Sequence, residues 1–271
     1  MKTGFIGIGN MGGAILRGYA SSSQGEKDRI MICDPNRERS EAVLKEFPRI
    51  SMTEDILDLV RASEAIVLGV KPQAIDDVLE VMAKAYLPEK LVISMAAGIS
   101  IAHIRKFLGR DAKIVRIMPN TPALIGEGMI AVCPGDGLSL ADLTGVDAIL
   151  KPTGKTEEVP ESMIDCVIGV SGSSPAYTFM YIEAMVKAAA ANGMPMSMAR
   201  TFAAQAVMGA AKLVMESPKS LEQLRIDVCS PGGTTIEAVK VLQKNGFEED
   251  VRQAFQAAVD RSKEMTRQKG E

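Results

Sequence analysis

Five short apolar runs, separated by helical segments, recur through the first 117 residues of the chain. The run at 65–70 shows no alternation of apolar and polar residues, which is typical of a strand buried on both faces. Such strands, joined by helices, form parallel sheets that helices cover on both sides. The pattern therefore predicts a doubly wound α/β domain of the Rossmann type. The expected strands are 2–8, 29–34, 65–70, 90–94 and 112–117, and the expected helices are 11–20, 36–47, 73–85 and 100–108.

The second half of the chain has a different pattern, because no strand-like run occurs between 172 and 271. Apolar residues there recur with the spacing of helices, and Gly, Asn and Pro mark the ends. We expect an all-helical domain that begins near residue 158. The expected helices are 176–192, 197–215, 235–244 and 247–268.

Composition argues against several classes of function. Lys and Arg number 31 against 34 Asp and Glu, so no basic face for nucleic acid is indicated. Apolar residues at 46% and charged residues at 24% are ordinary for a soluble globular protein and do not indicate a membrane protein. The four Cys lie far apart and there is a single His, so the spacing of a metal site is missing. Asn10 and Arg17 interrupt a leader-like start, and we expect a cytoplasmic protein.

Gly7, Gly9 and Gly12 form the spacing GxGxxG directly after the first expected strand and at the start of the first expected helix. In this context the motif is typical of a dinucleotide-binding loop. Gly7 permits a tight turn, Gly9 lets the backbone approach a pyrophosphate, and Gly12 allows close packing of the helix. The helix N-terminus then attracts the phosphates. A glycine turn without a ligand is the alternative, because the chain has 24 glycines.

Asp34 ends the second expected strand, about 20 residues after Gly12. An acid at this point accepts hydrogen bonds from the ribose hydroxyls of NAD. Arg37 and Arg39 follow within one turn, and their guanidinium groups suit the 2′-phosphate of NADP. An exposed helix face explains the two arginines equally well. The choice between NADH and NADPH is therefore left open.

Four further stretches have the composition of ligand-binding loops. Val70-Lys71-Pro72 follows the third expected strand, at the sheet edge where ligands bind in doubly wound folds. Two prolines make the turn at 116–122 rigid. The stretches 170–177 and 227–235 lead into helices, and the free N–H groups of a helix start bind anions. Helix capping alone is the alternative explanation for their Ser and Thr side chains.

At these residues the chain resembles the pyrroline-5-carboxylate reductase family, in the family's order and spacing over nearly the whole chain. The stretches that carry the resemblance are FIGIGNMGGAI at 5–15, VKP at 70–72, MAAG at 95–98, RIMPNTP at 116–122, VSGSSPAY at 170–177 and SPGGTT at 230–235. The resemblance implies the final step of proline biosynthesis, the reduction of the cyclic imine 1-pyrroline-5-carboxylate to L-proline with NADPH or NADH. It also implies a dinucleotide-binding domain at 1–157 and a helical substrate-binding and dimerisation domain at 158–271.

The resemblance further implies the residues of the site, with no metal among its parts. The expected cofactor-binding residues are Ile6, Gly7, Ile8, Gly9, Asn10, Met11, Asp34, Gly69, Val70, Lys71, Pro72, Met95, Ala96 and Ala97. The expected substrate-binding residues are Asn120, Ser171, Gly172, Ser173, Ser174, Ser230, Gly232, Gly233, Thr234 and Thr235. Two positions depart from the family: it usually has Gly where this chain has Ser174, and commonly has Asn near residue 56, where this chain reads Glu54-Asp55-Ile56-Leu57.

The chain offers few residues for acid–base catalysis. A dehydrogenase that acts on an alcohol or carbonyl needs an acid or base such as His, Lys or Tyr. His103 lies in an expected helix away from the loops, and the catalytic Lys of related hydroxyacid dehydrogenases corresponds to Thr178 here. A cyclic imine removes this requirement, because its nitrogen takes a proton from solvent and catalysis then rests on orientation. We expect Thr235 to act as the catalytic residue by hydrogen-bonding to the imine nitrogen.

Two alternatives stay open: a reductase of another small imine or hydroxyacid, and a nucleotide-sensing protein of the same fold without turnover. The segment 183–215 has only Glu183, Lys187, Arg200 and Lys212 as charged residues and is otherwise largely apolar. A helix pair that is apolar on most faces is central in its own domain or covered by a partner. We expect a homodimer, with assembly of dimers into a ring as a further option.

Overall fold

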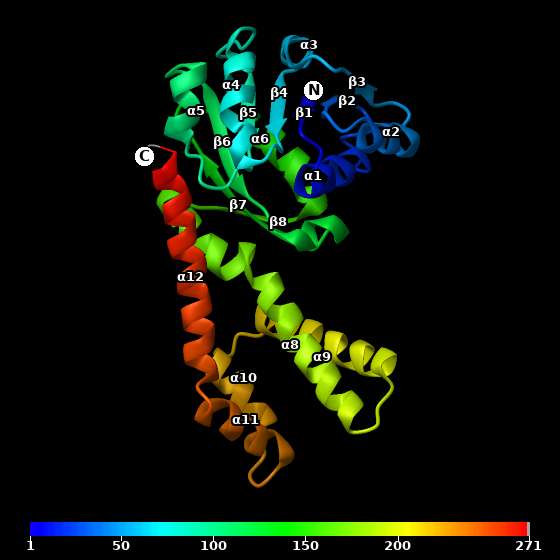
Figure 1. Cartoon of the computed structure of the whole chain (residues 1–271), viewed down its shortest axis with the longest axis vertical. Coiled ribbons are helices and arrows are strands. Elements are labelled where there is room, and N and C mark those ends of the chain that lie inside the picture. Colours follow the sequence, from blue (N-terminus) through cyan, green and yellow to red (C-terminus); the bar gives the residue numbers. More distant parts are fainter. Residues whose placement is uncertain (270–271) are drawn as a thin grey trace. The chain divides into compact units, whose positions relative to one another are not determined.

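The computed structural model describes residues 1–269 and divides the chain into two compact units. The first unit contains Met1–Ser173 together with the chain from Ala258 onward, and the second contains Ser174–Ala257. The predicted border near residue 158 coincides with the end of the last strand, whereas the first unit continues to Ser173. In Figure 1 the colours follow the chain through both units, from blue at the N-terminus to red at the C-terminus.

An eight-stranded sheet forms the centre of the first unit, in the order β3-β2-β1-β4-β5-β6-β7-β8 (Figure 1). Neighbouring strands are parallel except for β6 and β7, which are antiparallel. The strands are β1 (Lys2–Ile6), β2 (Arg29–Cys33), β3 (Ser51–Met52), β4 (Ala65–Leu68), β5 (Leu91–Ser94), β6 (Lys113–Met118), β7 (Gly128–Pro134) and β8 (Gly154–Glu158). The five predicted strands are confirmed as β1, β2, β4, β5 and β6, while β3, β7 and β8 were not predicted.

Successive residues of the central strands enter two separate cores, as expected for a sheet covered on both faces. Phe5 packs with helices α1, α2 and α6, whereas its neighbour Ile6 packs with α3, α4 and α5. Likewise, Val67 belongs to the core that contains Phe5, and Leu68 belongs to the core that contains Ile6. The helices are α1 (Asn10–Ala20), α2 (Arg37–Glu46), α3 (Ile56–Ala62), α4 (Ile75–Ala83), α5 (Ile101–Leu108) and α6 (Leu140–Leu150). The doubly wound α/β prediction is therefore confirmed.

Helices make up the rest of the described chain. A short helix α7 (Ile164–Val167) and a π-helical turn, Ile168–Gly172, precede the second unit. The remaining helices are α8 (Ser174–Ala191), α9 (Met196–Glu216), α10 (Leu221–Val228), α11 (Thr234–Lys244) and α12 (Phe247–Gln268). The four predicted helices agree with α8, α9, α11 and α12 to within two residues at each end, and α10 was missed. Helix α12 begins in the second unit and ends in the first.

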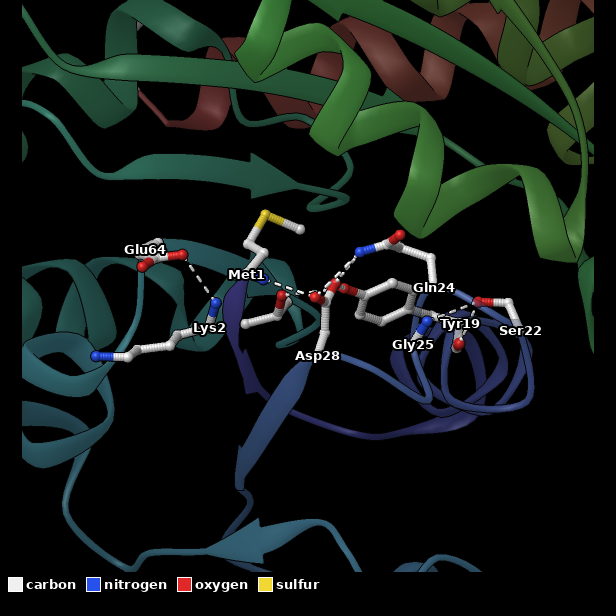
Figure 2. Close-up of polar contacts among 9 residues, drawn as sticks. Met1, Lys2, Tyr19, Ser22, Gln24, Gly25, Asp28 and Glu64 are labelled. Carbon is white, nitrogen blue, oxygen red and sulfur yellow. Dashed lines mark hydrogen bonds and ion pairs between the residues drawn. The ribbon is translucent and has the colours of Figure 1, made fainter.

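A buried carboxylate ties the first strand to the start of the second (Figure 2). Asp28 accepts hydrogen bonds from the Met1 amine at 2.6 Å, from the Gln24 amide at 3.1 Å and from the Tyr19 hydroxyl. Burial alone raises the pKa of Asp28, but the hydrogen bonds from Met1, Tyr19 and Gln24 outweigh it and lower the pKa overall. Burial and the neighbouring carboxylate raise the pKa of Tyr19, so its hydroxyl remains a donor.

We expect Asp28→Asn to lower the free energy of unfolding by about 2 kcal/mol at neutral pH, because the charge-assisted hydrogen bonds are lost. A carboxyl with a depressed folded pKa stabilises the protein above its unfolded pKa of about 3.9, and this contribution is lost as pH falls through the folded pKa. The difference between wild type and variant therefore shrinks below about pH 4. Urea unfolding followed by circular dichroism at several pH values measures it.

The matched control is Glu64→Gln, which changes an exposed carboxylate in the same close-up (Figure 2). The Glu64 side chain accepts a hydrogen bond from the Lys2 amide at 2.9 Å. We expect this variant to lose less than about 1 kcal/mol. Equal losses for the two variants, or an Asp28→Asn loss that stays constant into acid, would contradict the assigned role of Asp28.

Candidate active site

The three motif glycines differ in what surrounds them. Gly7 has a φ of +83°, and a Cβ there would lie 2.8 Å from the Val70 amide nitrogen. A Cβ on Gly12 would lie 2.4 Å from the Gly7 carbonyl oxygen. By contrast, no atom of the described chain beyond the chain neighbours of Gly9 and the backbone of α1 lies within 4 Å of a Cβ placed on Gly9. The backbone itself requires Gly7 and Gly12, whereas Gly9 leaves open space at the N-terminus of α1.

Open space at this position suits an anionic ligand. Gly9 is the N-cap of α1 and has no side chain to cap the helix, whereas Asn36 and Ser100 cap α2 and α5 with their side chains. The first turn of α1 also has no acidic residue. Its N–H groups and the positive end of the helix dipole are therefore available to phosphate oxygens.

Asp34 follows β2, and its side chain is only 3% exposed. One carboxylate oxygen accepts the Ile8 amide proton at 2.7 Å, and the other accepts from the Asn36 amide at 2.8 Å. The Arg39 guanidinium lies 3.3 Å from both oxygens. Asp34 thus holds the glycine loop against the end of β2, and Arg39 is paired with it. Arg37 forms an exposed ion pair with Glu41 at 3.0 Å.

A cavity of about 550 Å³ opens beside this loop, at the carboxyl ends of β1, β2 and β4. This volume is within the range of small-molecule sites. The lining includes Gly7, Asp34, Arg37, Glu54 and Val70. Glu54 thus brings an acid to the cavity in the segment where the family commonly has Asn. Thr53 and Val78 also line the cavity and were not predicted.

Two further predicted cofactor loops follow β4 and β5; β4 pairs with β1, and β5 pairs with β4. Gly69 contacts the glycine loop so closely that a Cβ would lie 2.3 Å from the Gly7 carbonyl oxygen. Val70, Lys71 and Pro72 continue this loop, and Met95, Ala96 and Ala97 follow β5. The Ala96 side chain is buried in the core that α3, α4 and α5 cover. Gly98 has a φ of +72° and packs on the backbone of α12 at Met265. The sheet therefore brings the three loops to one edge.

The predicted substrate residues are divided between the two units. Asn120 and the segment 171–173 belong to the first unit, and Ser174 and the segment 230–235 belong to the second. Ser171 and Gly172 lie in the π-helical turn, and Ser174 begins α8.

The SPGGTT segment forms the start of α11. Gly232 has a φ of +68°, and the Gly233 amide donates to the Ser230 carbonyl at 3.0 Å. Gly233 is the N-cap and has no side chain, and Thr235 lies in the first helical turn. As at α1, the helix start exposes N–H groups that an anion can occupy.

The titratable groups His103, Asp76 and Cys133 lie outside these loops. His103 is buried and forms a 2.7 Å hydrogen bond to Asp76, which also accepts from Lys269 at 2.9 Å. Burial opposes ionisation of Asp76, but the hydrogen bonds from Lys269 and His103 lower its pKa overall. Burial raises the pKa of Cys133 to about 11, so this thiol is protonated at neutral pH. None of these groups offers an acid or base to the loops.

The part of the chain that the structure describes contains neither a metal-binding cluster nor a membrane-spanning helix. Within residues 1–269, no three His, Cys, Asp or Glu side chains group in a way that would hold a metal ion. Over the same residues, every helix is too short or too polar to cross a membrane.

Comparison with known proteins identifies the family. Residues 161–265 match the family model for pyrroline-5-carboxylate reductase dimerisation, and residues 2–98 match that for NADP oxidoreductase, coenzyme F420-dependent. The pyrroline-5-carboxylate reductase of Escherichia coli is 42% identical, over 98% of each chain. The chain belongs to the pyrroline-5-carboxylate reductase family. The reductase of Synechocystis is 37% identical, again over 98% of each chain.

Solved structures of the family have the same fold. The Plasmodium falciparum pyrroline carboxylate reductase with NADP bound has a TM-score of 0.88 and 30% identity, over 98% of both chains. The Streptococcus pyogenes enzyme gives the same TM-score at 31% identity, over 97% of this chain and 98% of that one. Prephenate dehydrogenase from Aquifex aeolicus has a TM-score of 0.54 at 15% identity, over 91% of this chain and 99% of that one, which shows a shared fold alone.

Proposed function

We propose that this chain reduces 1-pyrroline-5-carboxylate to L-proline with NADPH or NADH. The observation that carries the proposal is the match to pyrroline-5-carboxylate reductases over 98% of both chains, which includes both the glycine loop and the SPGGTT helix start. The open space at Gly9 and the cavity beside it fit a dinucleotide, because a Cβ would fill the first and the second has the volume of a ligand site. The pathway assignment, proline biosynthesis in the cytoplasm, is part of this proposal.

When bound, the coenzyme would supply a hydride to the imine carbon, and the C=N π pair would become the lone pair of the nitrogen, which has taken its proton from solvent. The chain's own part is to hold the two reactants in register. The α1 N-terminus and loops 69–72 and 95–97 hold the coenzyme. The α11 N–H groups and Ser230 hold the substrate carboxylate. Thr235 hydrogen-bonds to the imine nitrogen and orients the ring for hydride transfer.

Both coenzymes are included in the proposal. Arg37 lines the cavity and is free to turn from its exposed pair with Glu41 toward a 2′-phosphate, which favours NADPH. Asp34 accepts from the Ile8 and Asn36 amides and, at a longer 3.3 Å, from Arg39, so a ribose hydroxyl that displaces an Arg39 contact would bond to Asp34, which favours NADH. Initial rates with each coenzyme give the ratio directly.

We further infer that the working form is a homodimer joined through the second unit, with a ring of dimers as a higher assembly. Large apolar side chains on α8 and α9 are exposed in the single chain, namely Phe179, Met180, Phe202, Met208 and Met215. A surface of this kind marks an interface. The dimerisation family model covers the same helices. Light scattering at assay concentration tests the inference, and a fully active monomer would contradict it.

Steady-state kinetics tests the reaction itself. With 1-pyrroline-5-carboxylate present, we expect oxidation of NADPH or NADH and formation of an equal amount of L-proline, measured by mass spectrometry. Hydroxyacids with the oxidised coenzymes are expected to give no comparable rate. Turnover of a hydroxyacid or another imine, without turnover of 1-pyrroline-5-carboxylate, would show that the chain has a different reductase activity. Coenzyme binding without turnover of any substrate would indicate a nucleotide sensor.

A further inference from the structure

Asn120 is a buried polar residue in the turn that follows β6, and it is 9% exposed. It precedes the 3₁₀ turn Thr121–Ile125, but its side chain does not cap that turn. Its side-chain oxygen instead accepts the Met129 amide proton at 2.9 Å. Its side-chain nitrogen lies 3.3 Å from the Ser171 carbonyl oxygen and 3.2 Å from the Ser171 hydroxyl. Both ends of the amide are thus engaged by the protein.

The orientation of this amide follows from its partners. The Met129 amide can only donate, so it requires the carbonyl oxygen of Asn120. The Ser171 carbonyl can only accept, so it requires the NH₂ group. Among the uncharged side chains, Asn and Gln carry a donor and an acceptor on one planar group, and Asn is the shorter. Asn120 therefore joins β7 to the segment that contains Ser171 through one short, rigid group.

The segment that Asn120 contacts has an unusual backbone. Residues Ile168–Gly172 form a π-helical turn, in which the Ser173 amide donates to the Ile168 carbonyl at 2.8 Å. Such turns are wider than an α-helix. They are rare in proteins, and those that occur are often found at functional sites. Asn120 gives the Ser171 carbonyl a donor from outside the turn. The contact thereby holds the turn at Ser171, three positions before Ser174 begins α8.

We propose that Asn120 is a positioning residue for the imine substrate. It does not touch the substrate, but through Ser171 it holds the segment 171–174, which binds the substrate. This inference rests on the proposed function, because that function places the segment 171–174 at the substrate. The hydrogen bonds of Asn120 favour a positioning role over direct contact with the substrate, because its acceptor is committed to Met129 and its donor group to Ser171. Loss of the donor alone is then expected to weaken substrate binding.

The test is Asn120→Asp, which keeps the acceptor for Met129 and replaces the donor toward Ser171 with an acceptor. We expect the KM for 1-pyrroline-5-carboxylate to rise about tenfold, as for the loss of one buried hydrogen bond. The Kd for NADPH is expected to change less than about twofold, because the hydrogen bonds of the Asn120 side chain go to Met129 and Ser171 and to no residue of the predicted coenzyme loops. Protonation of the introduced carboxyl restores a donor, so the KM ratio of variant to wild type is expected to fall as pH is lowered.

The matched control is Asn192→Asp, which makes the same chemical change at an exposed position. The Asn192 side chain donates to the Ala188 carbonyl at 2.9 Å near the end of α8. We expect this variant to keep the wild-type KM. Should Asn120→Asp fail to fold, Asn120→Ser removes both contacts without adding a charge and is expected to raise the substrate KM in the same selective way.

Three results would overturn the inference, and they differ in whether the proposed function fails with it. A folded Asn120→Asp variant with wild-type substrate KM would overturn the positioning role. Equal losses of substrate and NADPH affinity, with no recovery at low pH, would also overturn it, because they indicate general damage to the fold. Wild-type protein that does not reduce 1-pyrroline-5-carboxylate would refute the proposed function and, with it, this inference. An active wild type with an unaffected variant would refute the inference alone.

Discussion

Replacing Gly9 with alanine is expected to raise the KM for NADPH by roughly 30- to 150-fold, equivalent to a steric cost of about 2–3 kcal/mol. In the free protein the new methyl group meets no described atom within 4 Å beyond its chain neighbours and the backbone of α1. The backbone of Gly9, with φ −60° and ψ −164°, is one that alanine adopts. The apo fold is therefore expected to lose no more than about 1 kcal/mol, the usual range for a changed N-cap. Only a ligand at this position would meet the methyl group.

Two control variants are assayed beside Gly9→Ala, each for NADPH binding and for thermal unfolding. Gly12→Ala is expected to damage both folding and coenzyme binding, because its Cβ would lie 2.4 Å from the Gly7 carbonyl oxygen. Gly145→Ala, inside α6, is expected to leave NADPH binding unchanged, since its Cβ would meet only Met1 at an ordinary 3.5 Å. A folded Gly9→Ala variant with wild-type KM for NADPH would show that the glycine loop does not hold the pyrophosphate.

Thr235→Val is the second large expected effect, a loss of roughly 5- to 150-fold in kcat/KM. Valine keeps the shape of threonine but removes the hydroxyl that we propose bonds to the imine nitrogen. One buried hydrogen bond of about 1–3 kcal/mol accounts for this range. Binding of NADPH is expected to be nearly unchanged, because the coenzyme loops belong to the first unit.

The alternative role for Thr235 is to cap α11. The N-cap of this helix is Gly233, so Thr235 lies in the first turn and does not occupy the capping position. Steady-state kinetics beside a melting curve separates the two roles. Thr144→Val, at an exposed position on α6, serves as the control for a helical threonine and is expected to keep full activity. A stable Thr235→Val variant with wild-type kcat/KM would remove Thr235 from the active site.

The sequence predicted the centre of the sheet and missed its edges. The central strands are continuous apolar runs, because both of their faces are buried. The edge strand β8 reads Gly-Lys-Thr-Glu-Glu, and its polar composition hides it from a search for apolar runs. Strand β3 has only two residues, too few for any periodicity. The antiparallel β7 breaks the alternation of strand and helix, so the regular pattern gave no reason to expect it.

The local part of the candidate site was predictable, whereas its long-range contacts were not. Gly7, Gly9 and Gly12 are recognisable because their roles depend on neighbouring backbone. The contact of Asn120 with Ser171 spans 51 positions of sequence, and no local pattern indicates it. The bond from the Ile8 amide to Asp34 depends likewise on the pairing of β1 with β2. Such contacts are determined by strand order, which a single sequence does not specify.

Transfer of a labelled hydride tests the central claim most directly. The enzyme is incubated with 1-pyrroline-5-carboxylate and NADPH that carries deuterium in both positions at C4 of the nicotinamide, and the product is examined by mass spectrometry and NMR. The proposed reaction predicts L-proline with one deuterium, on the ring carbon bonded to nitrogen that does not carry the carboxylate. Unlabelled proline, deuterium at another carbon, or the absence of proline would contradict it.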